Sequence, residues 1–581
     1  MLELSPEQRS IVDAAGHVVV IAGPGAGKTR TVVAKIGSLL QSEMLAFPFS
    51  VLAVTFTDAA ARELRGRLAR FVPASRDCAW CGTFHSFGGY LLRAFGRRVG
   101  VAEDFIVADR HDVHEIRETV TADHPMFTDG ALSSEIEKLK RQVIYPGDAS
   151  SAFGDENISS AYAQYQQVLL DKNMLDFNDL VALSFRLLRD HEDIRALVRN
   201  KFRYTIVDEF QDTDSLQLEL VTILASGQMG SMVVADDDQA IFSWRGAVRA
   251  NVQAIQERLG STVWPLVYNF RSRRAIVSAA TALINRDDQR NAKILTTDAQ
   301  GGEVLVRACL TPDDEAAAIV QTIERLVADG RMPHEIAIIS RARYRNDAIL
   351  GALQNMTVPW FDRDRLTHRD AWETNAVLAL VRLSLNHDDG LALGALVDAL
   401  DDGNVVDDGY LEACAMRLRV GRRKPADSIA DVQDMIHRSE LTLLIARTKR
   451  VSEQRRATRN LASLTRDLEV EVEGGTGVVD AATRFIGEGA VQFATGHAVK
   501  GREFDSVFMM GLEDDVLPSY RSKSSATQLA EERRIFYVAL TRARLEVRLS
   551  FAQSRRGRFG METKQPSRFI ADLPRDVVGA W

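Results

Sequence analysis

The sequence is poor in the features that tie a chain together covalently or hold it in a membrane. It has four cysteines among 581 residues, too few for a disulfide framework, so we expect a reducing compartment, the cytoplasm. No apolar run approaches the ~18 residues that a membrane helix needs. The start, "MLELSPEQ", has neither the basic residues nor the apolar core of a secretory signal. We therefore expect neither secretion nor a membrane partner.

The sequence also has no excess of positive charge. Its formal net charge is −8, which speaks against a protein that coats nucleic acid but is compatible with a local DNA-binding groove. The stretch 417–459 is basic, and it fits either a solvated helix face or a surface that contacts duplex DNA. Cys78 and Cys81 form a lone "CAWC" with no second ligand pair nearby in the sequence, so a structural role is favoured over a metal site.

Short β-branched runs alternate with helical patterns along the chain, which predicts an α/β fold with parallel sheets. The expected strands are 17–23, 50–56, 202–210, 231–238, 302–308, 335–340, 489–495, 506–512 and 545–552. Two long helical stretches interrupt this alternation, at 86–199 and 369–475. We therefore expect two α/β domains, 1–85 with 200–265 and 266–368 with 476–581, each interrupted by a helical insert.

The stretch "AGPGAGKT" (22–29) has the form of a phosphate-binding loop between a strand and a helix. Gly23, Gly25 and Gly27 let backbone amides approach the phosphates of a nucleotide. Lys28 adds positive charge, and the Thr29 hydroxyl can bind Mg²⁺. The strict pattern begins with Gly, where this chain has Ala22. Ala26 also lies within the loop, and Arg30 directly follows the motif.

The stretch "TIVDEFQDTD" (205–214) places two carboxylates at the end of an expected buried strand. Asp208 at this place can hold Mg²⁺, and Glu209 can orient and deprotonate an attacking water. A water-activating glutamate favours hydrolysis over phosphoryl transfer to a substrate. The two motifs together predict a nucleoside triphosphate hydrolase rather than a kinase.

Later motifs follow in a specific order. They are "LAVTFTDAAARELRGRL" (52–68), "GTFHSFG" (82–88), "VDEFQDTDSLQ" (207–217), "ADDDQAIFSWRGA" (235–247), "NFRS" (269–272), "ATGHAVKGREFDSVFMMGLEDDVLP" (494–518) and "EERRIFYVALTRAR" (531–544). In this series the chain resembles superfamily 1 DNA helicases of the UvrD/Rep/PcrA type over nearly its whole length. The resemblance implies two RecA-like motor domains that use ATP and Mg²⁺.

The resemblance also implies roles for single residues at the nucleotide. Arg271 and Arg542 match the two family arginines that reach the phosphates, and Gln239 matches the γ-phosphate sensor. Glu503 matches a ribose contact. Gln8 would contact the adenine edge and Arg30 would lie near the phosphates. Phe270 stands where the family usually has a tyrosine that stacks on adenine, so the ring face is kept and the hydroxyl is lost.

A second set of implied residues concerns single-stranded DNA, which such proteins hold by stacking bases on aromatic rings. Trp244 and Phe56 match family stacking positions, although a buried core aromatic is an alternative for Phe56. The residues that match contacts to the DNA backbone, or lie beside them in the motifs, are Thr83, His85, Arg245, Thr495 and His497.

Two departures from the family concern duplex DNA. The insert at 369–475 looks short, and "DDGNVVDDG" stands where the family has a glycine turn that grips the duplex. Family members often carry an aromatic strand-separating pin before "PSRF", whereas this chain has "GMETKQPSRF" (560–569) with Thr563 near that place.

The leading hypothesis is a DNA helicase and single-stranded DNA translocase that moves 3′ to 5′ and acts at single/double-strand junctions. The alternative is an ATP-regulated DNA sensor or motor subunit that acts with a separate nuclease or repair protein. A third possibility, an RNA helicase, fits the scaffold but not these motif spellings.

Overall fold

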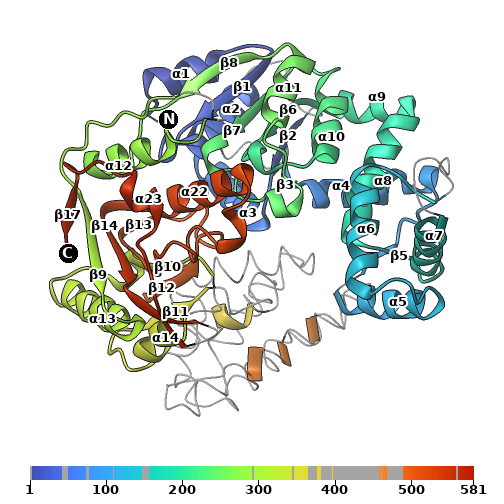
Figure 1. Cartoon of the computed structure of the whole chain (residues 1–581). Helices are drawn as coiled ribbons and strands as arrows, with labels where there is room; N and C mark the ends of the chain where they lie inside the picture. The colour runs from blue at the N-terminus through green and yellow to red at the C-terminus, as the bar shows by residue number, and fades with distance from the viewer. Residues whose placement is uncertain are drawn as a thin grey trace. The chain divides into compact units, whose positions relative to one another are not determined.

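The structure is a computed structural model that describes residues 3–41, 50–72, 78–108, 110–146, 156–288, 290, 293–342, 346–363, 489–557 and 560–581, with short runs between 374 and 466. These residues divide into two compact units, Met1–Gln300 and Gly301–Trp581. Each unit is built on one parallel sheet (Figure 1). The expectation of an α/β fold with two parallel sheets is therefore confirmed.

The sheet of the first unit has six strands in the order β3-β2-β6-β7-β1-β8. Its strands are β1 (His17–Ala22), β2 (Ser50–Thr55), β3 (Ala79–Thr83), β6 (Phe202–Val207), β7 (Gly230–Ala235) and β8 (Thr262–Leu266). The central strands β2 and β7 are buried at every position, as parallel strands covered on both faces must be. β8 is an edge strand, where Pro265 costs no ladder hydrogen bond.

Helices cover both faces of this sheet. Those near the strands are α1 (Pro6–Asp13), α2 (Lys28–Gln41), α3 (Asp58–Phe71), α10 (Ser215–Ala225) and α11 (Asn251–Leu259). A further helix, α12 (Arg274–Ile284), follows β8 in the chain. One core joins β1, β2, β6 and β7 to α2 and α3. A second core packs the other sheet face against helices that follow β3, so the helical segment continues the hydrophobic core of the sheet.

That helical segment lies between β3 and β6. It consists of α4 (Phe84–Phe95), α5 (Arg110–Asp123), α6 (Asp129–Arg141), α7 (Glu156–Asp171), α8 (Phe177–Asp190) and α9 (Glu192–Lys201), with a small sheet of β4 (Ile106–Val107) and β5 (Met174–Leu175) (Figure 1). α4 and α8 pack closely, because Gly88 presents no side chain where the Leu180 carbonyl approaches.

The sheet of the second unit has seven strands in the order β11-β12-β10-β13-β14-β9-β17. They are β9 (Glu303–Cys309), β10 (Ile336–Ser340), β11 (Trp360–Asp362), β12 (Val491–Thr495), β13 (Phe504–Met509), β14 (Ala543–Ala552) and β17 (Val578–Ala580). The helices are α13 (Pro312–Ala328), α14 (Asp347–Gln354), α22 (Ala526–Leu540) and α23 (Arg568–Ala571). A separate hairpin pairs β15 (Ser554–Gly557) with β16 (Gly560–Thr563).

The structure differs from the expected strands at several places. β6 ends at Val207, three residues before the expected end, because Glu209 takes a left-handed backbone conformation that breaks the strand. The strands that were not expected are β3, β4, β5, β8, β11, β15, β16 and β17. The expected second insert, its basic stretch 417–459 and the segment "DDGNVVDDG" lie almost entirely outside the described residues.

Candidate functional site

One edge of the first sheet collects most of the residues singled out in the sequence. The strands of this sheet are parallel, so their carboxyl ends lie along the same edge. The phosphate loop follows β1, Phe56 follows β2, Thr83 ends β3, Asp208 follows β6 and Asp236 follows β7. This is the edge at which open α/β sheets bind ligands.

The phosphate loop has the backbone that its sequence predicts. Gly25 and Gly27 have φ angles of 68° and 79°, which residues with a side chain rarely adopt. α2 starts at Lys28, so the unpaired amides of its first turn lie beside the loop. Ala22 and Ala26 are buried in the core under the sheet edge. This arrangement of amides suits a phosphate group.

The "NFRS" segment is seated on the phosphate loop within the same unit. Asn269 donates from Nδ2 to the Pro24 carbonyl at 2.7 Å, and the Phe270 amide donates to the Gly25 carbonyl at 3.0 Å. A Cβ atom on Gly25 would lie 2.7 Å from the Cβ atom of Arg271. The segment therefore places Arg271 directly beside the loop. The sequence analysis did not single out Asn269, since only the fold brings it to the loop.

Lys28 lies between two acidic residues from neighbouring strands. Its Nζ atom is 3.8 Å from Glu209 Oε1 and 3.6 Å from Asp236 Oδ2. The side chain of Lys28 is 13% exposed, so these charges interact through little water. Lys28 and Glu209 are thus brought together as expected. Asp236 was not expected at this place.

Asp208 and Glu209 form the acidic pair that the sequence predicts at the end of β6. Glu209 has a φ angle of 55°, a strained conformation that is typical of functional sites. Burial, and then repulsion by Glu209, raise the pKa of Asp208 to about 7. A divalent cation would relieve both effects, and Thr29 in the first turn of α2 offers a hydroxyl ligand. The residues therefore fit Mg²⁺ with a nucleotide.

Gln239 is linked to Glu209 by hydrogen bonds. Its Nε2 atom donates to Asp236 Oδ2, while the Asp236 amide donates to Gln211 Oε1 at 2.9 Å. Gln211 in turn donates from Nε2 to Glu209 Oε2. Two buried residues, Gln211 and Asp236, therefore connect Glu209 to Gln239 through hydrogen bonds. Gln211 was missed by the sequence analysis, although it lies in the "DEFQD" motif.

Asp236, Asp237 and Asp238 form an acidic loop that is almost wholly buried, with exposed fractions of 0%, 1% and 0%. Their carboxylates lie close enough together to bind a metal, but cations of the chain already occupy them. Lys293 contacts all three, Arg249 contacts Asp237, and Arg290 contacts Asp238. Burial lowers the pKa of Lys293, but the three carboxylates more than offset this and hold that pKa above its usual value.

Three further residues expected at the nucleotide, Gln8, Arg30 and Phe270, lie close to the phosphate loop in the chain or in the fold. Gln8 is 1% exposed and donates from Nε2 to the Ala26 carbonyl at 3.1 Å, while its Oε1 accepts from the Ser5 amide. The Nε2 end of the Gln8 amide thus holds the loop and the Oε1 end caps α1. The adenine contact stays a prediction. Arg30 is exposed. The exposed ring of Phe270 lies 4.5 Å from that of Tyr268.

Three aromatic rings form a group at the same sheet edge. Phe56 stacks on Phe242 with ring centres 5.5 Å apart, and Phe242 contacts Trp244 at 6.4 Å. Phe242 is buried, whereas Trp244 is 64% exposed. The structure thus brings together Phe56 and Trp244 and adds Phe242, which the sequence analysis missed. The side chain of Arg245 lies outside the described residues.

His85 and Thr83 lie at the start of α4. Thr83 caps the helix through a hydrogen bond from the Ser86 amide. The His85 ring stacks on Phe177 with centres 3.7 Å apart, and burial lowers the pKa of His85 to about 4. Phe177 itself is 56% exposed. It is a further exposed aromatic beside expected DNA contacts, and the sequence analysis missed it in "LDFNDL".

The second unit holds the remaining expected residues. Thr495 ends β12 and His497 follows it, both half-buried. Glu503 pairs with Arg544 just before β13. Arg542 is 2% exposed and donates to the carbonyls of Val538 and Arg502. The Phe504 amide donates to the Arg542 carbonyl, so the segment after Glu503 adjoins Arg542.

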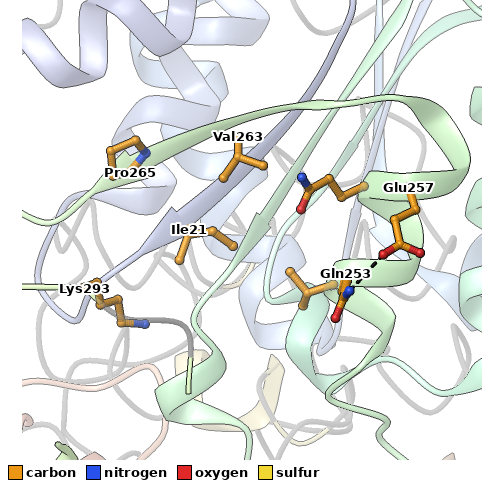
Figure 2. A pocket seen from close by; sticks show the side chains of 8 residues that line it. Ile21, Gln253, Glu257, Val263, Pro265 and Lys293 are labelled. Atoms are coloured by element: carbon orange, nitrogen blue, oxygen red, sulfur yellow. Dashed lines mark hydrogen bonds between the residues drawn. The ribbon is translucent and has the colours of Figure 1, made fainter. Parts of the chain in front are cut away.

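A pocket of about 520 Å³ lies beside the edge strand of the first sheet. Figure 2 shows side chains from β1, β8 and α11 around it, with Lys293 near Pro265 and Ile21. Gln253 and Glu257 on α11 bond to each other at 2.8 Å on the opposite side. The glycines of the phosphate loop do not line it, so this pocket is separate from the candidate nucleotide site.

Two features bear on the remaining expectations. Burial raises the pKa of the Cys81 thiol to about 12, so the thiol is protonated at neutral pH, and the structural role of "CAWC" stays a prediction. The residues expected near a strand-separating pin form β16, whose partner is β15. Within the described part of this hairpin, Met561 is the exposed apolar side chain, at 63%.

The fold and the site together define a P-loop protein with two α/β units, each built on a sheet of parallel strands. The N-terminal part, residues 4–260, matches the family model of the UvrD/REP helicase N-terminal domain. Residues 265–403 and 437–554 match that of the UvrD-like helicase C-terminal domain. The chain belongs to the UvrD-like helicase family.

Relatives of known name align over nearly the whole chain. DNA helicase II of Escherichia coli (strain K12) is 30% identical over 99% of this chain and 88% of its own length. The ATP-dependent DNA helicase PcrA of Bacillus subtilis (strain 168) is 29% identical over 99% and 86%, respectively. A probable DNA helicase II homolog of Rickettsia conorii is 29% identical over 99% and 96%. Among the described residues, no helix is long and apolar enough to cross a membrane.

Proposed function

We propose that the protein is an ATP-dependent DNA helicase and single-stranded DNA translocase that moves 3′ to 5′. The family and the names of its relatives support ATP use and action on DNA. The polarity rests on the resemblance of the motifs alone. The cytoplasmic location also stays a prediction.

One observation carries the proposal. The short segment after β7 holds Gln239, which is bonded to the carboxylate beside Lys28, and the aromatic pair Phe242 and Trp244. Gln239 and Trp244 are separated by four residues. A change at the phosphates would therefore reach the ring that we propose to stack on a base through only these few residues of backbone. This is the coupling that a motor on single-stranded DNA requires.

Within this proposal the residues have defined roles. The phosphate loop and Lys28 bind the phosphates of ATP, and Thr29 and Asp208 hold Mg²⁺. Glu209 orients and deprotonates the attacking water, and Gln239 reports the γ-phosphate. Arg271 lies beside the loop, while Arg542 belongs to the second unit, and both are proposed to stabilise the charge that develops on the phosphoryl group.

The proposed DNA contacts form a second group. Phe56, Phe242, Trp244 and Phe177 would offer ring faces to bases. Thr83, His85, Arg245, Thr495 and His497 would contact the sugar-phosphate backbone. Because stacking is worth roughly 1–3 kcal/mol per base and every base has a ring face, we expect affinity with little sequence preference.

Strand separation provides the test. ATP hydrolysis and unwinding are measured on 3′-tailed and 5′-tailed duplexes, with excess single-stranded trap to prevent reannealing. The proposal expects ATP hydrolysis stimulated by DNA and unwinding of the 3′-tailed duplex alone. No stimulation by single-stranded DNA would contradict it, and equal or greater stimulation by RNA would favour an RNA helicase.

A second candidate is a DNA sensor or motor subunit that needs a nuclease or repair partner. The β15–β16 hairpin favours it, because Met561 rather than an aromatic ring is exposed on its described part. Against it, the two residues that join these strands in the sequence include Phe559. Stimulated ATP hydrolysis without any strand separation would support this candidate, and loss of unwinding in Phe559→Ala with ATP hydrolysis kept would assign the hairpin to strand separation.

A further inference from the structure

Lys293 is a buried lysine near the candidate ATP site that the motifs do not include. It lies between α12 and β9 in the sequence, and its aliphatic chain lines the pocket beside β1 and β8 (Figure 2). The residue is 7% exposed. Its Nζ atom lies 2.6 Å from Asp236 Oδ1 and 2.9 Å from Asp237 Oδ1, and it donates to the Ala22 carbonyl at 3.1 Å. Lys293 thus joins the acidic loop to the start of the phosphate loop.

Asp236 is shared between two lysines. Its Oδ1 atom contacts Lys293, while its Oδ2 atom faces Lys28 at 3.6 Å and accepts from Gln239. Asp236 is fully buried, so its charge needs a cation nearby at all times. Of the two lysines, only Lys28 belongs to the loop that binds phosphate.

A nucleotide phosphate competes with Asp236 for Lys28. Charge-assisted hydrogen bonds to phosphate are strong, but withdrawing Lys28 from a buried carboxylate has a cost that depends on what remains beside that carboxylate. Lys293 remains, at the shorter distance. A carboxylate that already has this partner attracts Lys28 less strongly.

We propose that Lys293 is a positioning residue of the ATP site, which neutralises Asp236 so that Lys28 is available to the phosphates of the nucleotide. This inference rests on the proposed ATP binding and adds a residue to it. Lys293 itself need not touch the nucleotide. The effect acts on affinity for ATP rather than on the chemical step.

The other cations of the acidic loop supply a matched control. Arg249 contacts Asp237 at 3.2 Å and Asp287 at 3.5 Å, and Arg290 contacts Asp238. Arg249→Gln removes one positive charge from the acidic loop but none from Asp236. If Lys293 mattered only for the stability of the acidic loop, Arg249→Gln and Lys293→Met would affect ATP binding alike.

The test is the Kd of a fluorescent, non-hydrolysable ATP analogue with Mg²⁺, measured on the full chain. Lys293→Met should weaken binding about tenfold, a typical size for coupled buried charges. Lys293→Arg should restore most of it, and Arg249→Gln should stay within about twofold of the wild type. The kcat at saturating ATP should change less than KM.

A double variant separates positioning from general damage. In the Lys28→Ala background, Lys293→Met should weaken binding no further, because no lysine is left to be released. In the Asp236→Asn background, which also lowers the risk that Lys293→Met fails to fold, the substitution should again have no effect. An equal loss in either background would overturn the inference, as would wild-type affinity in folded Lys293→Met. If the wild type itself does not bind the analogue, the proposed ATP binding fails instead.

Discussion

Two lysines of the first unit are buried among carboxylates, and the two clusters differ in what else can reach them. Lys140 on α6 is 0% exposed and lies 2.6 Å from Asp176 and 2.8 Å from Asp179. Tyr165 and Tyr145 donate to the same two carboxylates at 3.0 Å. All these partners are fixed within the helical segment.

The acidic loop around Lys293 has one partner that can leave. Lys28 contacts Asp236 but also belongs to the phosphate loop. The partners of Lys140 named above all lie in the helical segment, so we expect that cluster to act on stability, whereas a cluster with an exchangeable cation can respond to a ligand. We therefore expect substitutions in the first cluster to change the stability of the fold, and substitutions around the second to change the affinity for nucleotide.

The largest effect is expected at the nucleotide. Glu209→Gln keeps the size of the side chain but removes the base that takes a proton from water. ATP hydrolysis should fall by about 10²–10⁴-fold, the usual worth of a general base. The analogue Kd and the unfolding midpoint should change little. Wild-type turnover in this variant would show that Glu209 is not the base.

Lys140→Met should lower stability and leave ATP hydrolysis unchanged, the reverse of Glu209→Gln. It leaves Asp176 and Asp179 buried without their cation, which is expected to cost ~3–5 kcal/mol of stability. Urea unfolding followed by circular dichroism measures this. ATP hydrolysis per folded molecule should be close to wild type at low temperature. A large loss of turnover with unchanged stability would remove the distinction between the clusters.

A further buried carboxylate, Asp208, belongs to neither cluster and makes stability depend on pH. Its folded-state pKa of about 7 lies above the unfolded value, so the folded state holds the proton more tightly. This contribution is fully present at low pH and is lost as the pH rises to 7. Asp208→Asn should therefore raise the melting temperature at pH 8 without nucleotide, and the gain should shrink toward pH 5. A gain that is the same at both pH values would contradict the raised pKa.

The smallest effect is expected from Tyr165→Phe. The change removes one donor to Asp176, which keeps Lys140 and its capping bond to the Asp179 amide. The expected cost is about 1–2 kcal/mol. The same unfolding measurement checks it, and a cost as large as that of Lys140→Met would mean that the hydroxyl, not the ion pair, holds the cluster.

Most of the fold, the phosphate loop and the acidic pair could be predicted, because each is indicated by residues that are close together in the sequence. The phosphate loop and the "DE" pair each follow a β-branched run, and parallel strands bring such ends to one edge. The sequence therefore assigns Lys28 and Glu209 to one nucleotide site, and the structure brings the two side chains together. The strand β3 was missed because "AWCGT" is short and was interpreted through its cysteine.

Apart from Gln211, which lies within a motif, the residues that were missed lack a local signal. Lys293 is 57 residues from Asp236 along the chain, and nothing in "NAKIL" indicates an acidic partner. In the sequence, Asn269 looks like an ordinary turn residue, and only the structure shows its hydrogen bond to the phosphate loop. In the sequence, Phe242 and Phe177 look like core aromatics. Only the structure shows that they stack on Phe56 and His85, two of the expected DNA contacts.

The central claim is that ATP chemistry and DNA contact are coupled through the segment after β7. The most direct measurement is steady-state ATP hydrolysis by the pure wild-type protein, titrated with single-stranded oligonucleotide. We expect turnover to rise with DNA and saturate, and the DNA concentration at half-maximal stimulation to be higher for Trp244→Ala than for the wild type. Turnover that does not respond to DNA would show that the two are not coupled.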